Sequence, residues 1–225
     1  LPAFSDGQIL QTLRIPVERT LLAHLADAGR LAESRPRVVG DQSIGHARHV
    51  RLLAGMFPEA RFILCTRDVR DASLAAWTHL GAPSGGGVLA PATSLHEGAE
   101  IFARHHWAEL IRFSRGPGRQ MGPDRFLELD HETHHADPPA SIRRLLEFLE
   151  LERSDRTVAS IAETTGDDDA RSGIGGWRER FTEEFAAYLI AEAGERLALG
   201  EEPVDNRPRI QWTGPTTRPE ALPAA

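Results

Sequence analysis

The chain has 225 residues, and its 26 basic residues, all of them arginine, are outnumbered by 33 acidic ones, which gives a net charge of −7. This charge excludes a general nucleic-acid binder and a protein held on an anionic membrane surface, while a local arginine pocket for phosphate stays open. The single cysteine, Cys65, excludes an internal disulfide framework and a multi-cysteine metal site. No signal-peptide pattern follows Leu1, so we expect a cytoplasmic protein whose N-terminus is processed or truncated.

Length and composition favour one domain over residues 1–200, followed by a Pro-rich tail over residues 201–225. The longest stretch without Asp, Glu or Arg, residues 72–96, contains a glycine run and Pro91. That composition cannot form an apolar membrane helix of about 20 residues and is typical of a surface loop. We therefore expect no membrane-embedded segment.

The first half of the chain alternates helical and strand patterns. Apolar residues recur at helical spacing over residues 16–32, with Pro16 expected in the first turn, and residues 37–40 form a short strand candidate. A helix is expected over residues 46–57, ended by Pro58. Residues 62–65 (FILC) form a continuous apolar run, the pattern of a parallel strand covered on both faces.

The same alternation continues to the last predicted helix. Helices are expected from the end of the 62–65 strand to residue 80 and over residues 95–113, with a strand over residues 125–129. Asp137 and two prolines begin a further helix, and a helix capped by Thr182 follows the glycine-rich segment 171–177. The pattern predicts an α/β fold with a central, mostly parallel sheet flanked by helices.

Arg67 follows the 62–65 strand directly, at the edge of the sheet where open α/β proteins bind ligands. A guanidinium group at this position can hold a phosphate through two hydrogen bonds, with help from backbone N–H groups at the start of the next helix. The structural alternative is an arginine paired with Asp68 or Asp71 at a helix start. Position alone leaves both interpretations open.

Three segments, in the same order, resemble the sulfotransferase family. The first is residues 57–71 (FPEARFILCTRDVRD), which is similar to an aromatic-Pro-x-Ala-basic strand running into an Arg-Asp-Pro-Arg-Asp turn. The second, residues 125–149, resembles a strand followed by Tyr-Glu-Asp-Leu, an Asp-Pro helix start and Phe-Leu-Gly. The third, residues 171–178 (RSGIGGWR), resembles the C-terminal Arg-Lys-Gly loop.

The resemblance implies a P-loop-kinase-like fold and transfer of a sulfuryl group from 3′-phosphoadenosine 5′-phosphosulfate (PAPS), leaving 3′-phosphoadenosine 5′-phosphate (PAP). It assigns the 3′-phosphate of the cofactor to Arg67 and Arg171, with backbone help from Ser172 and Gly173. Ser73 is a further cofactor-binding candidate, because the family serine at this helix falls on Ala75.

Several cations of the family pattern have no counterpart here. The family's first strand and lysine-bearing phosphate loop are not found in residues 1–35, and we expect them upstream of Leu1. A second family lysine falls on Gln42, and the lysine of the closing loop falls on Ser172. The resulting alternative is a catalytically degenerate, sulfotransferase-like binding domain.

The acceptor side of the reaction needs a base. His46 lies at the predicted strand-to-helix turn where family members place one, and an imidazole suits this role because its pKa lies near working pH. Asp41 could orient His46 or act as the base itself. The expected partner is a small hydroxylated or amine acceptor, with a role in secondary metabolism and with a homodimer left open.

Residues 131–135 (HETHH) match the zinc-peptidase pattern H-E-x-x-H, which raises a zinc-dependent hydrolase as a remote alternative. The pattern needs both histidines one turn apart on a long helix. A strand precedes it and Pro138 follows within three residues, so we expect no metal site and place His131 and Glu132 beside the cofactor or acceptor cleft.

Overall fold

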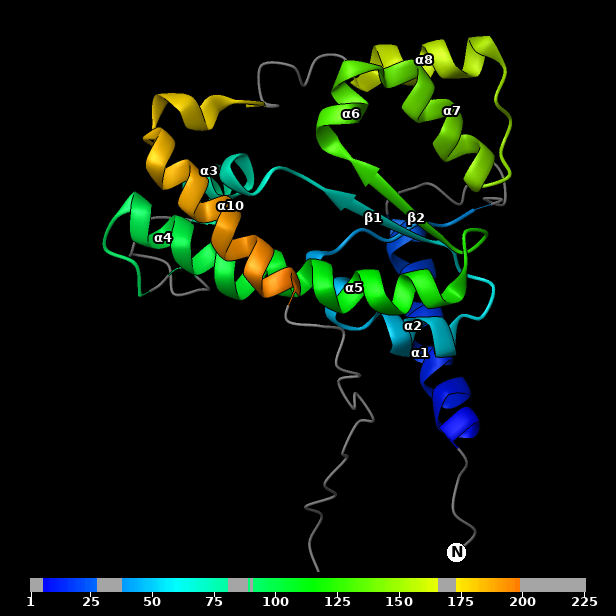
Figure 1. Ribbon diagram of the computed structural model, residues 1–225. Helices are drawn as coiled ribbons and strands as arrows, with labels where there is room; N and C mark the ends of the chain where they lie inside the picture. Colours follow the sequence, from blue (N-terminus) through cyan, green and yellow to red (C-terminus); the bar gives the residue numbers. More distant parts are fainter. Residues whose placement is uncertain (1–5, 28–37, 81–88, 90, 166–172, 199–225) are drawn as a thin grey trace, which may run out of the picture.

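The computed structural model describes residues 6–27, 38–80, 89, 91–165 and 173–198. In these ranges the protein is mostly helical around two paired strands (Figure 1). The N-terminal part comprises α1 (Asp6–Asp27), the 3₁₀ helix η1 (Ile44–Arg48), α2 (Val50–Met56), β1 (Phe62–Thr66) and α3 (Val69–Leu80). The remainder comprises α4 (Leu95–Phe102), the π-helical turn η2 (Ala103–Trp107), α5 (Ala108–Met121), β2 (Phe126–Asp130), α6 (His131–Ala136), α7 (Pro138–Phe148), α8 (Asp155–Thr165), η4 (Gly176–Glu179) and α10 (Glu183–Ala198).

β1 and β2 pair in parallel, with Phe62 opposite Phe126 and Thr66 opposite Asp130. Both strands therefore end at the same edge, and each is followed directly by a polar turn or helix (Figure 1). The expected parallel pairing is confirmed. The wider central sheet is not seen in the part of the chain that the structure describes, where the sheet has these two strands.

The N-terminal predictions need two corrections. α1 begins at Asp6, so Pro16 lies inside the helix rather than in its first turn. Val38 to Gly40 do not form the expected strand: Val38 and Val39 are 50% and 43% exposed, and no strand lies beside them within the described residues. An extended segment without a hydrogen-bonding neighbour is not a strand. Arg37 lies outside the described residues.

β1 was predicted to be covered on both faces, and this is wrong for one of them. Ile63 is 38% exposed and Cys65 is also exposed, whereas the alternate residues of the strand are half-buried. On the other strand, Phe126 and Leu127 are buried. The apolar run was correctly predicted to be a strand, but its second face lies open in the described part of the chain.

α5 lies along the two strands and also packs against α10 (Figure 1). Its approach to β2 is close: a Cβ atom on Gly118 would lie 2.2 Å from the Phe126 ring, so this position of α5 needs a glycine. Arg115 and Arg119 of α5 both bind the carboxylate of Glu128 on β2, at 2.9 and 3.0 Å. The predicted helix 95–113 is confirmed and extends to Met121, with the π-helical turn inside it.

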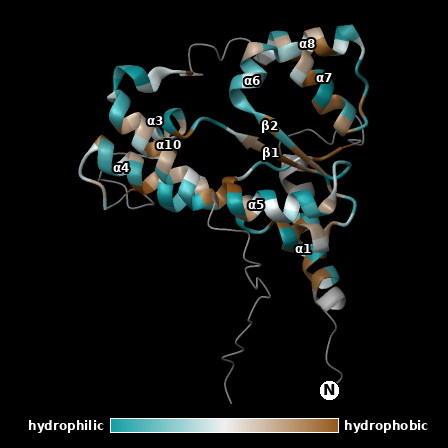
Figure 2. Cartoon of the chain, viewed as in Figure 1, coloured by the Kyte–Doolittle hydropathy of each residue, from teal (hydrophilic) through white to brown (hydrophobic). Residues whose placement is uncertain are grey.

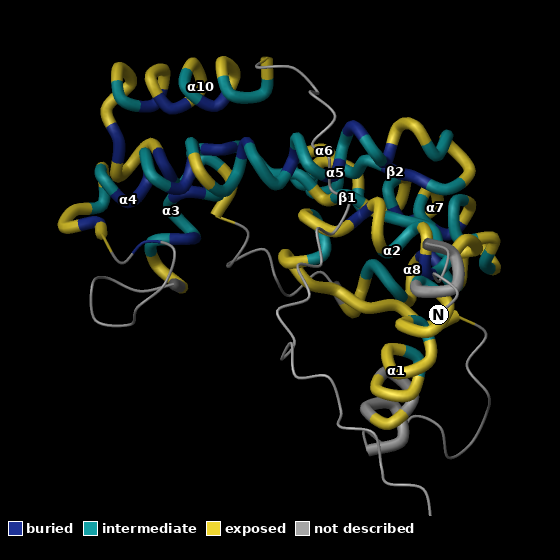
Figure 3. Tube along the Cα trace, turned by 90° about the horizontal axis from the view of Figure 1, so that it is seen from below, coloured by how far each residue is buried: buried dark blue, intermediate teal, exposed yellow. Residues whose placement is uncertain are grey.

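The main apolar core joins α3, α4, η4 and α10. Figure 3 shows the buried side of α10 facing α3 and α4 and its exposed side facing away, while α1 is largely exposed. The buried members of this core are Val69, Ala99, Ala103, Trp177, Phe181, Ala186, Leu189 and Ala193. A smaller cluster of Ile142, Leu146 and Val158 joins α7 to α8.

Two predicted helix starts are confirmed by their caps. Asp137 accepts a hydrogen bond from the Ala140 amide at 3.0 Å, and Thr182 accepts one from the Phe185 amide at 3.2 Å. Both are N-cap bonds, which satisfy amides that have no partner within the helix. Among the described residues, no helix combines the length and the apolar composition that crossing a membrane requires.

Candidate functional site

The turn between β1 and α3 carries Arg67, and two neighbouring elements fix its backbone. The Trp107 indole Nε1 donates to the Arg67 carbonyl oxygen at 2.8 Å, and the Asp68 amide donates to Glu132 Oε1 at 2.8 Å. Trp107 belongs to the π-helical turn, and π-helical turns recur at functional sites. The position of Arg67 is therefore set by segments 40 and 64 residues away in the chain.

Asp68 is the N-cap of α3. Its carboxylate accepts from the Arg70 amide at 2.8 Å and binds the Arg70 guanidinium group through Nε at 2.9 Å. Burial alone would raise the pKa of Asp68, but the hydrogen bonds from Arg70 and from the Asp71 amide outweigh it and hold this pKa below its usual value. The expected help for a phosphate from the first amides of this helix is thus not available at Asp68 and Arg70, because carboxylates already bind them.

Asp71, on the first turn of α3, binds the glycine-rich loop. Its side chain is 2% exposed and accepts from the Gly175 amide at 2.7 Å and the Trp177 amide at 3.1 Å. Trp177 is buried, and the guanidinium carbons of Arg70 and Arg178 lie 4.1 and 4.6 Å from its ring centroid. The glycine-rich loop therefore contacts the segment after β1, and Asp71 makes this contact.

The predicted cofactor-binding residues other than Arg67 fall into three groups. Gly173 is exposed at the start of the described part of the loop. Arg171 and Ser172 lie outside the described residues. Ser73 is fully buried and its hydroxyl donates to the Ala99 carbonyl oxygen at 3.4 Å, so it faces the α4 contact rather than a ligand. We therefore remove Ser73 from the candidate phosphate contacts.

His46 and Asp41 form a hydrogen-bonded pair, with Nε2 and Oδ2 2.7 Å apart. η1, which carries His46, is capped by Ser43 and packs on α5, where Arg48 approaches Glu109 at 3.4 Å. Because a carboxylate accepts hydrogen bonds, the bond from Nε2 leaves the lone pair of a neutral His46 ring on Nδ1. Both side chains are about half exposed, at 40% and 51%, so a solvent-side acceptor could reach this pair.

His106 is a further candidate base, although the sequence led us to assign no chemistry to it. It lies half-buried in the π-helical turn, one residue before Trp107. Burial lowers the pKa of His106, and the nearby charge of Arg48 lowers it further. A neutral imidazole at pH 7 is the protonation state that a general base requires.

The HETHH segment forms α6, a six-residue helix that starts where β2 ends. Figure 2 shows it in hydrophilic colours. The His131 and His135 rings pack edge to face with centroids 4.5 Å apart, and Glu132 binds the Asp68 amide. Within the described ranges, no three His, Cys, Asp or Glu side chains converge as metal ligands do. Glu132 thus lies beside the Arg67 turn.

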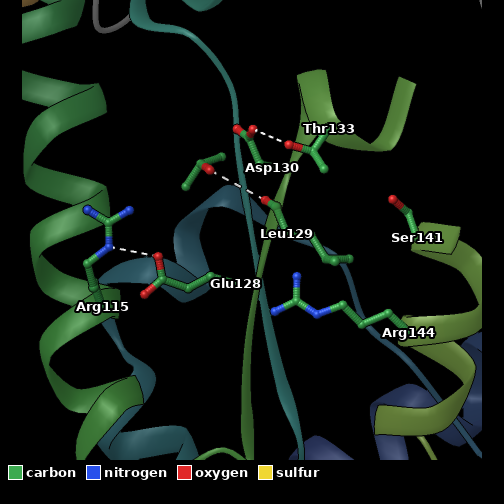
Figure 4. Close-up of a pocket in the computed structure, with 8 residues that line it drawn as sticks. Arg115, Glu128, Leu129, Asp130, Thr133, Ser141 and Arg144 are labelled. Carbon is green, nitrogen blue, oxygen red and sulfur yellow. Dashed lines mark hydrogen bonds and ion pairs between the residues drawn. The ribbon is translucent and has the colours of Figure 1, made fainter. Parts of the chain in front are cut away.

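A polar pocket of about 330 Å³ lies beside the same edge of the sheet (Figure 4). Its wall comes from the carboxyl ends of β1 and β2 and from α5, α6 and α7. Asp130 accepts from the Thr133 hydroxyl at 2.8 Å, and Arg144 extends from α7 toward β2 (Figure 4). Thr66 lines the pocket and directly precedes Arg67, so the pocket adjoins the turn.

Comparison with known proteins identifies the family of the chain. A family model described as "Sulfotransferase family" matches residues 6–155, two thirds of the chain. The chain belongs to the sulfotransferase family. The matched range includes the His46–Asp41 pair, the Arg67 turn and α6, and it stops before the glycine-rich loop. No curated protein and no solved structure matches the chain.

Three residues of this site bind partners that the sequence did not predict: Asp71, Trp107 and Glu132. Asp71 was visible in the Arg-Asp-x-Arg-Asp pattern, but its partners are backbone amides more than 100 residues away. Nothing in the local pattern around Trp107 indicates a bond to Arg67. Glu132 was expected near the cleft, but its partner, the Asp68 amide, was not predicted.

Proposed function

We propose that this sulfotransferase-family protein uses PAPS and transfers its sulfuryl group to a hydroxyl or amine of a small-molecule acceptor. The observation that carries the proposal is the contact between the glycine-rich loop and the first turn of α3, made through the buried carboxylate of Asp71, four residues after Arg67. These are the two segments to which the resemblance assigns the 3′-phosphate, and they lie more than 100 residues apart in the chain.

The donors at this turn fit a phosphate group. Arg67 supplies a guanidinium group, which binds phosphate oxygens through two parallel hydrogen bonds. The loop supplies the amide of Gly173, with a φ of 51°, from an exposed turn closed by a hydrogen bond from the Gly176 amide to the Gly173 carbonyl oxygen at 3.0 Å. The α3 amides of Asp68 and Arg70 do not contribute, because carboxylates bind them.

When bound, PAPS supplies an activated sulfuryl group and a stable leaving phosphate. In our proposal the Nδ1 atom of His46 takes the proton of the acceptor hydroxyl or amine. Asp41 orients the ring through Nε2 and stabilises the imidazolium form that results. Asp41 remains the alternative base, because its carboxylate is also accessible. The pocket beside Thr66 offers polar side chains for a small hydroxylated acceptor.

Replacing Arg67 tests the cofactor assignment. Arg67→Ala should weaken the affinity for PAP, measured by isothermal titration calorimetry, by more than about tenfold, because a charge-assisted pair is lost. The matched control is Arg143→Ala, which removes an arginine that pairs with Asp155 on the exposed side of α7. An unchanged PAP affinity in the Arg67 variant would refute the assignment of the phosphate to this residue.

A catalytically degenerate binding domain is the second candidate. It is favoured by the absence of lysine from the chain and by the neutral Gln42 at a family lysine position. The two functions differ in turnover. The enzyme binds PAP and releases a sulfated product when PAPS and a phenolic acceptor are supplied, whereas the degenerate domain gives neither a thermal shift with PAP nor sulfated product.

A further inference from the structure

Asp71 is a buried charged group whose role the chemistry proposed above does not specify. An ionised carboxylate that is 2% exposed is costly unless hydrogen bonds compensate for its lost hydration. Both compensating donors given above, the amides of Gly175 and Trp177, come from the glycine-rich loop. The hydrogen bonds of the Asp71 carboxylate therefore attach the backbone of this loop to α3.

The loop has a shape that suits this attachment. Gly175 has a φ of +75°, in the left-handed region where a side chain is strained, and a Cβ atom there would lie 2.4 Å from Arg178 Nη1. With the backbone in this conformation, the amides of Gly175 and Trp177 both point at the carboxylate of Asp71. On the other side, Asp71 lies four residues after Arg67, in the helical turn that Asp68 caps.

We propose that Asp71 is a positioning residue: it holds the glycine-rich loop against the first turn of α3, so that the Gly173 amide and the Arg67 guanidinium group bind one phosphate. This inference rests on the proposed function, because the phosphate is the 3′-phosphate of PAPS. Asp71 does not touch the ligand in this arrangement. It acts through the loop backbone.

The sign of the effect separates positioning from simple electrostatics. Asp71→Asn keeps the shape of the side chain and removes a negative charge near a site for an anion. By Coulomb's law alone, this change strengthens phosphate binding. Positioning predicts the opposite, because an amide group offers one acceptor oxygen in place of two and the loop loses at least one of its bonds.

The experiment compares wild type, Asp71→Asn and a matched control, Asp137→Asn. In the control, the altered carboxylate also accepts a backbone amide bond, from Ala140, at the start of α7. We expect the Asp71 variant to bind PAP about tenfold more weakly by calorimetry. Amide hydrogen exchange without ligand should accelerate at Gly175 and Trp177 in this variant. The control should match wild type in both measurements.

A second variant approaches the same contact from the loop and leaves Asp71 intact. Gly175→Ala strains the left-handed backbone and should also weaken PAP binding, by a smaller factor of about threefold. PAP affinity in Asp71→Asn that equals or exceeds that of wild type overturns this inference and leaves the proposed function standing. A wild-type protein that does not bind PAP overturns the proposed function, and this inference with it.

Discussion

The two halves of the candidate site are built in different ways. The Arg67 turn is bound by an indole from η2, a carboxylate from α6 and, through Asp71, the loop before η4. The segment that carries Asp41 and His46 is largely exposed, and the two side chains hold one another. The Arg67 turn, the proposed phosphate side, is therefore held by tertiary contacts, whereas the proposed base depends on a local pair at the surface.

This difference predicts different responses to substitution. Exposed pairs contribute between about 0 and 1 kcal/mol to stability, so changes at His46 or Asp41 should leave the fold intact. Changes in the Arg67 turn should alter stability and ligand binding together, because the same bonds serve both. For each half, the loss of activity or ligand binding can be compared with the loss of stability, and the ratio of the two tests that half separately.

The largest effect is expected at the base. His46→Ala should lower kcat by about 100-fold or more, as general base catalysis contributes at least this much, while the melting temperature stays within about 1 °C of wild type. Asp41→Asn should give a smaller loss of kcat, because the ring remains but loses its orienting partner.

The matched control for this test is His49→Ala, which removes an exposed imidazole one turn further along. Sulfated product is measured by mass spectrometry and the melting temperature by scanning calorimetry. Equal kcat values for the His46 variant and wild type would exclude His46 as the base and direct attention to His106.

The π-helical turn gives an intermediate effect. Trp107→Phe keeps an aromatic ring but removes the hydrogen bond to the Arg67 carbonyl oxygen. The free energy of unfolding should fall by about 1 kcal/mol, the usual contribution of one buried hydrogen bond. PAP affinity should fall by about threefold, because Arg67 loses part of its support.

Trp77→Phe serves as the control, since Trp77 packs against the same cluster of Ala76 and Phe102 that Trp107 contacts, whereas the bond to the Arg67 carbonyl oxygen comes from Trp107. Chemical denaturation and PAP calorimetry give the two quantities. If both tryptophan variants changed PAP affinity equally, the bond to Arg67 would have no specific role in ligand binding.

The smallest effect is the pH dependence of the α3 cap. The pKa of Asp68 is lowered in the folded protein, so its stabilising contribution is present above the unfolded-state pKa and is lost as pH falls through the folded-state pKa. Asp68→Ala should therefore cost about 1 kcal/mol at pH 7. The difference from wild type should shrink below about pH 4. Urea unfolding at pH 7 and pH 3 measures it, and a constant difference would contradict the capping role.

Local patterns were sufficient for most of the helices and for both strands. The apolar run of β1, the Asp137 cap and the Thr182 cap depend on neighbouring residues, and the structure confirms each of them. Two local patterns failed where the surroundings decide the outcome. Val38 and Val39 have strand-like side chains but no neighbouring strand in the described chain, and Pro16 is tolerated inside α1.

The sequence by itself determined that Arg67 follows a strand, that a glycine-rich loop lies near residue 175, and that the pattern resembles a sulfotransferase. Only the tertiary structure decided what holds them: Asp71 binds the loop, Trp107 binds the Arg67 carbonyl, and Ser73 turns into the core. The physical reason is that strand and helix signals arise from neighbours in the chain. The partner of a buried carboxylate or indole depends instead on which distant backbone groups packing brings within 3 Å or so.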